Sequence, residues 1–298
     1  MMKTGVFFVG LSTVLGVGIS QAAITFTVTF TLQAQSDLSV AEQALFTDGL
    51  AAWDDIIDGH RDGAVRPDWD LMVDTFSAPA SGGGVTLGTA GPSGVTFSNV
   101  VPGAATSDQR FIISTGGNAN FNVHPDAGAL QAAVIKHEIG HALGIGTLWE
   151  DNEVYNDGDG ATGNRTLAGG TPGQYMGAAG LAAYQVEFDA AALFIPVELD
   201  GGGGTANGHW NEVTDNFSVE NSPGFDSDPG DGGPAPNSVN GSLDDELMTG
   251  VLGGSPYLSN TTIQHLFDIG FNLEPIPEPS SGLLLGAGFV LLGLRRRR

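Results

Sequence analysis

Apolar residues alternate with threonines between residues 24 and 32, near the amino end of the chain. A period of two is typical of a β-strand with one buried face, so this stretch predicts a strand. Shorter apolar segments between glycines predict further strands or sheet edges, at residues 71–76, 84–87, 95–101 and 110–114. The first half of the chain is therefore expected to build a sheet.

Two longer segments of the first half show helical spacing. Behind a capping box of Ser39 and Glu42, apolar residues recur every three or four positions as far as residue 59. This predicts a helix that packs on the sheet. A second helix is expected over residues 129–143, with Asp126 as its cap.

The second half has shorter helical patterns and more irregular sequence. A short helix is predicted within residues 175–188, and another over 261–269, capped near Ser259 and ended by Gly270. Residues 215–241 are poor in apolar side chains and predict an inserted surface loop. The overall expectation is an α/β (α+β) fold with a twisted mixed sheet and two long helices in its amino-terminal part.

The amino terminus has the features of an export signal. Within residues 1–22, Lys3 precedes an apolar run, and Ser20 and Ala22 supply small residues for a cleavage site. We therefore expect secretion, with cleavage by a signal peptidase near Ala23.

The carboxyl terminus carries a second targeting pattern. Pro-Glu-Pro at 277–279 is followed by an apolar run at 282–294 and by four arginines. Thirteen apolar residues fall short of the roughly 20 needed for a stable transmembrane helix. The segment 274–298 resembles the PEP-CTERM sorting signal of Gram-negative bacteria, which implies processing by an exosortase and a basic end that stays cytoplasmic.

Composition narrows the classes of partner. The chain has 10 basic and 34 acidic residues, a net charge of −24, and no cysteine. Such a charge repels nucleic acid and anionic lipid, so we expect neither as a partner. Without cysteine, disulfides and thiolate metal sites are excluded.

The sequence HEIGHALGIG, residues 137–146, carries the strongest chemical signal. Two histidines four residues apart on a helix direct their imidazoles to one point, the arrangement of a zinc site. Glu138 beside them can take a proton from a zinc-activated water as a general base. The alternative interpretation is an ordinary amphipathic helix.

Gly144 can end this helix with a positive φ, as in the metzincin pattern. That pattern expects a third histidine where this chain has Thr147. The short form of the pattern is therefore absent. His60, His124 and His265 are expected to be structural or surface histidines.

Five blocks of sequence resemble the leishmanolysin-like metallopeptidases, in the order of that family. They span residues 137–149, 172–185, 204–212, 245–250 and 258–271. The resemblance implies a metzincin-like zinc peptidase with an amino-terminal lobe, residues 23–146, and a largely irregular carboxy-terminal lobe, residues 147–273. In that family the third zinc histidine follows a long insertion, which accounts for Thr147.

By this resemblance, His209 completes the zinc site with His137 and His141, and Met248 is the methionine of the Met-turn. Glu212 is a rival third ligand, because other HExxH enzymes use a glutamate from a downstream helix. The glycines around His209 disfavour a helix there, and we prefer His209.

Asp157 and Asp159 alternate with glycines in one acidic loop, and a second loop is rich in aspartate, which suggests Ca²⁺ as a second cofactor. The candidate ligands are Asp157, Asp159, Asp226, Asp228 and Asp231. Ordinary turn chemistry is the alternative, because neither spacing completes an EF-hand loop.

These features together predict a secreted zinc metalloendopeptidase whose substrate is a protein or peptide. The first alternative is a non-enzymatic surface or matrix protein with a structural metal site. A carbohydrate-binding protein is a third class, but the sequence offers no aromatic platform for it.

Overall fold

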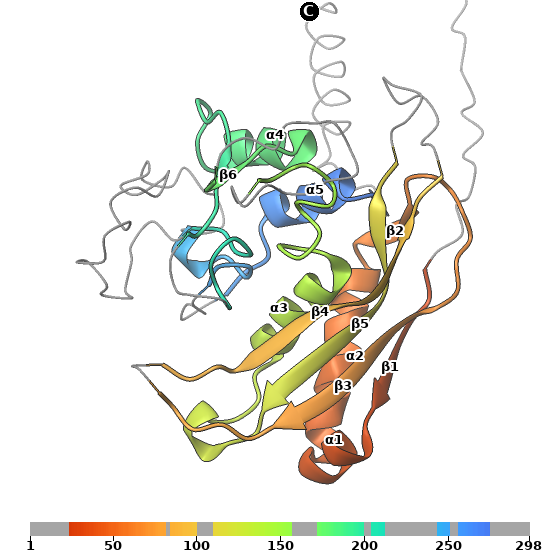
Figure 1. The fold of residues 1–298 in the computed structure, drawn as a ribbon, viewed down its shortest axis with the longest axis vertical. Helices are drawn as coiled ribbons and strands as arrows, with labels where there is room; N and C mark the ends of the chain where they lie inside the picture. The colour runs from red at the N-terminus through yellow and green to blue at the C-terminus, as the bar shows by residue number, and fades with distance from the viewer. Residues whose placement is uncertain are drawn as a thin grey trace, which may run out of the picture.

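The computed structural model describes residues 24–81, 84–99, 110–156, 172–199, 204–211, 243–250 and 256–274 (Figure 1). The predictions for the signal segment 1–22, for the loop 215–241 and for the sorting segment from 275 onward lie outside these residues. Within the described ranges, no helix combines the length and hydropathy needed to cross a membrane.

A four-stranded mixed sheet forms the base of the fold (Figure 1). Its order is β1-β3-β5-β4, with β1, β3 and β5 parallel and β4 antiparallel at one edge. The strands are β1 Phe26–Phe30, β3 Trp69–Phe76, β4 Gly88–Phe97 and β5 Ile112–Asn122. The expected mixed α/β architecture is thus confirmed.

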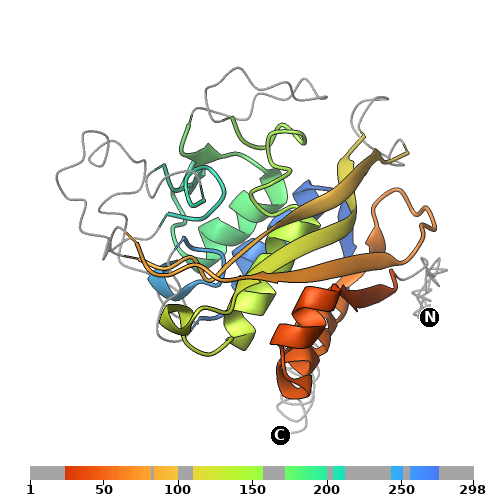
Figure 2. The same ribbon diagram turned by 60° about the horizontal axis from the view of Figure 1, so that its bottom comes forward.

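Two long helices, α2 (Val40–Asp54) and α3 (Ala132–Leu143), pack on one face of this sheet (Figure 2). Alternate residues of β3 show which face is covered, because Leu71 and Val73 are fully buried while Met72 is 46% exposed. Helix α3 approaches β5 so closely that a Cβ at Gly117 would lie 2.6 Å from Ala142 Cβ. The helix that carries the candidate zinc histidines is therefore fixed directly on the sheet.

The capping box of α2 forms as predicted, but the neighbouring boundaries differ. Thr31, at the end of the predicted first strand, caps an unpredicted short helix, α1 (Leu32–Asp37). Helix α2 ends at Asp54, and Ile57 begins β2 (Ile57–His60), which pairs with β8 (Phe271–Leu273). The partner strand lies more than 200 residues away, so local periodicity could not indicate it.

Glycine-rich segments form more of the sheet than the sequence predicted. The predicted strand at 84–87 is wrong, since Gly84 makes only an isolated bridge with Ser81. Strand β4 begins at Gly88, and β5 runs through Gly116 and Gly117 as far as Asn122. Pairing on both sides of β5 stabilises this segment despite its low strand propensity.

The cap of α3 also differs from the prediction. Asp126 belongs to the short helix η1 (Pro125–Ala127) and accepts the Ala80 N–H, while Gln131 precedes α3 without a side-chain cap. Helix α3 therefore begins three residues later than predicted, and its stability comes from burial against the sheet and α2.

The second half contains α4 (Ala178–Glu187) and α5 (Asn260–Asp268), which cap each other. The Glu187 carboxylate accepts the N–H groups of Asn260 and Thr261, and the Asp268 carboxylate accepts those of Ala179 and Gly180. A carboxylate at a helix N-terminus satisfies orphan donors and complements the helix dipole. A short pair of strands, β6 (Gln174–Tyr175) and β7 (Ile195–Pro196), lies beside them.

We predict that His60 makes the fold sensitive to acid. It is 5% exposed and stacks on Phe271, and burial lowers its pKa from 6.5 to about 4. As the pH falls, His60 is therefore protonated in the unfolded chain before it is protonated in the folded protein. The stabilisation that comes from the neutral ring is fully present above pH 6.5 and is lost as the pH falls towards 4. Between pH 6.5 and 4, the free energy of unfolding should therefore fall by about 3 kcal/mol less in His60→Phe than in the wild type, because phenylalanine does not titrate. Denaturant titration at both pH values measures this difference.

The stabilities of the two proteins at pH 8, where His60 is neutral, give the effect of the new ring on packing, apart from any effect of protonation. An equal loss of stability in both proteins between pH 6.5 and 4 would contradict the assignment.

Candidate metal centre

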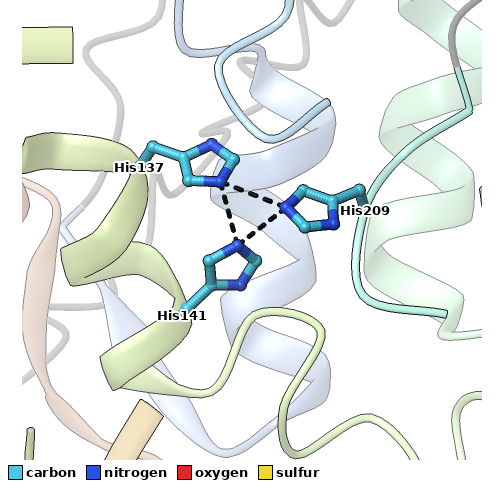
Figure 3. A group of neighbouring side chains, drawn as sticks. All are labelled: His137, His141 and His209. Carbon is cyan, nitrogen blue, oxygen red and sulfur yellow. Dashed lines mark hydrogen bonds between the residues drawn. The ribbon is translucent and has the colours of Figure 1, made fainter. Parts of the chain in front are cut away.

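Three histidine side chains from two parts of the chain meet at one point (Figure 3). His137 and His141 lie one turn apart on α3, and His209 comes from the segment 204–211. Their Nε2 atoms are 3.0 Å apart for His137 and His141, 3.0 Å for His141 and His209, and 3.1 Å for His137 and His209. The structure thus brings together the three residues predicted as zinc ligands.

The other ring nitrogen of each histidine binds a backbone carbonyl. Because a carbonyl only accepts, each Nδ1 must carry the hydrogen, and each Nε2 is left with a lone pair. The three lone pairs face one another without a donor between them. The carbonyls belong to Leu247, Ile145 and Thr205, at 2.7, 2.8 and 2.7 Å from His137, His141 and His209.

Burial keeps the three rings neutral. Desolvation lowers the pKa of His137, and it lowers that of His141 further with the help of the two neighbouring rings. For His209, burial and then His137 lower the pKa to about 3. Neutral imidazoles with fixed Nδ1–H groups are the ligands that zinc takes in proteins, at about 2.0–2.1 Å. The donor set therefore fits zinc.

Glycines after α3 allow the third histidine to approach. Gly144 follows the helix with φ +122°, and Gly146 has φ +72°. A Cβ at Gly146 would lie only 2.2 Å from the Gly208 carbonyl oxygen, so no side chain fits between the two segments. The residues next to the HExxH sequence thus shape the path by which His209 reaches α3.

Met248 lies against α3 at the level of the histidines. It is fully buried, and a Cβ at Gly140 would lie 2.8 Å from its Sδ. The methionine predicted for the Met-turn therefore contacts the zinc-motif helix through the glycine between the two histidines. Its neighbour Leu247 supplies the carbonyl for His137.

Glu138 is buried between α3 and the edge strand β4. It is 5% exposed, and a Cβ at Gly88 would lie 2.7 Å from its Oε1. Its Oε2 has no hydrogen-bond partner among the described residues, and burial raises its pKa to about 8. The carboxyl group is therefore held in place by packing, with a buried Oε2 that no described residue hydrogen-bonds.

Several groups that shape this site were not predicted from the sequence. Tyr155 donates its hydroxyl to Asn207 at 2.6 Å, and Asn207 adopts φ +64° two residues before His209. The three carbonyl acceptors were also missed. A backbone carbonyl is present at every residue, so no residue type marks the ones that orient a ring. The left-handed asparagine is the one signal that sequence reasoning could have used.

The structure does not test most of the remaining candidates. Asp157, Asp159, Asp226, Asp228, Asp231 and the rival ligand Glu212 lie outside the described residues. His265 is fully buried among the rings of Trp149, Tyr175 and Trp210.

Comparison with known proteins bears mainly on the tail. Residues 275–298 match the PEP-CTERM protein-sorting motif. This motif indicates export and anchoring at the surface of Gram-negative bacteria, and processing by an exosortase-type enzyme. A search of curated proteins finds no match to the chain, so the leishmanolysin-like resemblance stays a hypothesis.

We predict that Gly88→Ala disturbs Glu138 without removing the metal ligands. The added Cβ would meet Glu138 Oε1 and Cγ at 2.7 and 2.9 Å, so the carboxylate must move. If Glu138 is the general base, peptidase activity should fall by about tenfold or more, while zinc affinity stays close to that of the wild type.

The matched control is Gly91→Ala on the same strand. A Cβ there would meet nothing closer than Thr147 Cγ2 at 4.0 Å. Equal activities of the two variants would show that the contact with Gly88 does not position Glu138.

Proposed function

We propose that this chain is an exported zinc-dependent endopeptidase. The observation that carries the proposal is the meeting of three neutral imidazoles whose Nε2 atoms lie 3.0–3.1 Å apart with no hydrogen between them. Three acceptors in such an arrangement repel one another unless a cation is shared among them. The three ligands that meet among the described residues also leave a coordination position open, as in catalytic zinc sites and unlike closed structural sites.

The chemistry assigned to the site is hydrolysis. Zinc, when bound, would polarise a carbonyl group and make a water molecule more acidic. Glu138, next to His137 on α3, would accept a proton from the attacking water and deliver it to the leaving amine. Its burial supports this role, because a carboxylate in a poorly solvated site is a stronger base.

A peptide substrate suits the edge of the sheet next to Glu138. Strand β4 is an edge strand, and the Leu87 carbonyl binds Asn122 of β5. Because successive residues of a strand direct their backbone groups to opposite sides, Gly88 and Ala90 present theirs away from β5. An extended peptide could add to this edge as a further strand. The peptide bonds would then run past the carboxylate of Glu138.

The alternative is a non-enzymatic surface protein whose metal site is structural. The burial of His141 and His209, at 7% and 6% exposed, is the observation in its favour. A structural site has no use for an acid with a free oxygen in this position, so Glu138 argues for catalysis. Zinc content measured together with chelator-sensitive cleavage of an unfolded protein distinguishes the two functions.

We predict that Glu138→Gln abolishes cleavage and leaves zinc bound. The amide keeps the size of the side chain but cannot accept the proton, so the rate should fall by about 10²-fold or more. Metal analysis and a cleavage assay on the same sample test this. Near-normal turnover with a full complement of zinc would remove Glu138 from the mechanism.

We predict that His209→Ala weakens zinc binding severely and that Glu212→Ala has only a mild effect. His209 Nε2 lies 3.0 Å from His141 Nε2, so its loss removes one of three donors. Competition with a chromophoric chelator measures both affinities. The reverse order would make Glu212 the third ligand.

A further inference from the structure

We propose that Glu246 is the positioning residue of this metal centre, holding both the carbonyl that orients His137 and the segment that carries His209. The inference rests on the proposed zinc site. Glu246 is fully buried, directly follows the short helix η3 (Leu243–Asp245), and precedes Leu247 and Met248.

Both oxygens of the Glu246 carboxylate accept hydrogen bonds. Oε2 accepts the Met248 N–H, within its own turn. Oε1 accepts from Ser259 N–H at 3.0 Å, Ser259 Oγ at 2.9 Å and Thr262 Oγ1 at 2.7 Å, all at the N-terminus of α5. One side chain therefore joins the turn beneath α3 to a helix of the second half.

These contacts require the acceptor-only form of the side chain. The Ser259 hydroxyl already accepts the Thr262 N–H, and the Thr262 hydroxyl accepts Trp210 Nε1–H at 2.8 Å. Each hydroxyl thus has its own hydrogen left to donate to Glu246. With two backbone N–H groups as well, the carboxylate receives four donors, and an ionised carboxylate is the side chain that accepts them all.

Two short connections lead from Glu246 to the ligands. In the first, the carboxylate holds the turn in which the next residue, Leu247, gives its carbonyl to His137 Nδ1. In the second, the Thr262 hydroxyl donates to Glu246 and accepts from the indole N–H of Trp210, the residue that directly follows His209. The backbone N–H of Trp210 also donates to the Met248 carbonyl at 3.0 Å. Loss of the carboxylate should therefore loosen two of the three ligands.

Glu246→Gln tests the proposal, because it keeps the shape and replaces one acceptor oxygen by an NH₂ group. Whichever oxygen it replaces, the NH₂ group would face N–H or O–H donors and could not accept their hydrogen bonds. The matched control is Glu187→Gln. Glu187 is also buried and accepts N–H groups at the N-terminus of α5, but it joins α5 to α4. Both variants lose a carboxylate that caps the same helix.

The measurements are zinc affinity, by chelator competition, and the visible absorption spectrum of the cobalt-substituted full-length protein, at a temperature where circular dichroism shows each variant folded. Glu246→Gln should bind zinc about 10- to 100-fold more weakly and alter the cobalt bands, the usual range for groups that orient metal ligands. Glu187→Gln should match the wild type in both. Equal zinc affinity and equal spectra for Glu246→Gln and wild type, or the same losses in Glu187→Gln, would overturn the proposal.

If Glu246→Gln does not fold, Thr262→Val takes its place. It removes only the hydroxyl between Glu246 and Trp210 and keeps the branched shape of the side chain. Weaker zinc binding and shifted cobalt bands support the proposal, and unchanged values overturn it. A wild-type protein that binds no zinc overturns the proposed function itself, which is a different outcome from equal affinities.

Discussion

The candidate site depends on three N–H···O bonds that run from imidazole rings to the backbone. Each ring of the three histidines is fixed by a carbonyl from a different segment, so a ring cannot rotate without losing its hydrogen bond. Three Nε2 atoms are thereby held 3.0–3.1 Å apart at a buried position, with their lone pairs directed at one another. The backbone therefore fixes the arrangement of the three rings before any metal binds. The rest of the fold acts on the site by positioning these three carbonyl groups.

Two close approaches of the backbone make this placement feasible. Gly140 admits Met248 to the face of α3, and Gly146 admits the Gly208 carbonyl to the turn that follows the helix. A methyl group at Gly146 would meet the Gly208 backbone and push the two segments apart, whereas one at Gly140 would force the Met248 side chain to move. Gly146 therefore allows the segment of the third histidine to approach, and Gly140 makes room for the methionine beneath the site.

Sequence reasoning succeeded where a signal was local. The capping box of Ser39 and Glu42, the helix of the zinc motif and the Ser259 cap of α5 are all encoded within a few residues. His137 and His141 follow from helical periodicity alone, whereas His209 required a resemblance to a known family. Pairing over long distances was the main source of error, as with β2, whose partner β8 lies at the other end of the described chain. Contacts of this kind leave no periodic trace in either segment.

The mutual capping of α4 and α5 has a consequence for how this architecture can vary. Glu187 and Asp268 join two helices whose nearest ends are separated by residues 188–259, and the segment that carries His209 lies between them. The entropic cost of closing a flexible loop rises only with the logarithm of its length, by about 0.6 kcal/mol for each doubling. Two helices that hold each other by their ends can therefore tolerate inserted sequence between them at small cost. Lineages with a short or a long insertion at this position could keep the same frame around the three histidines.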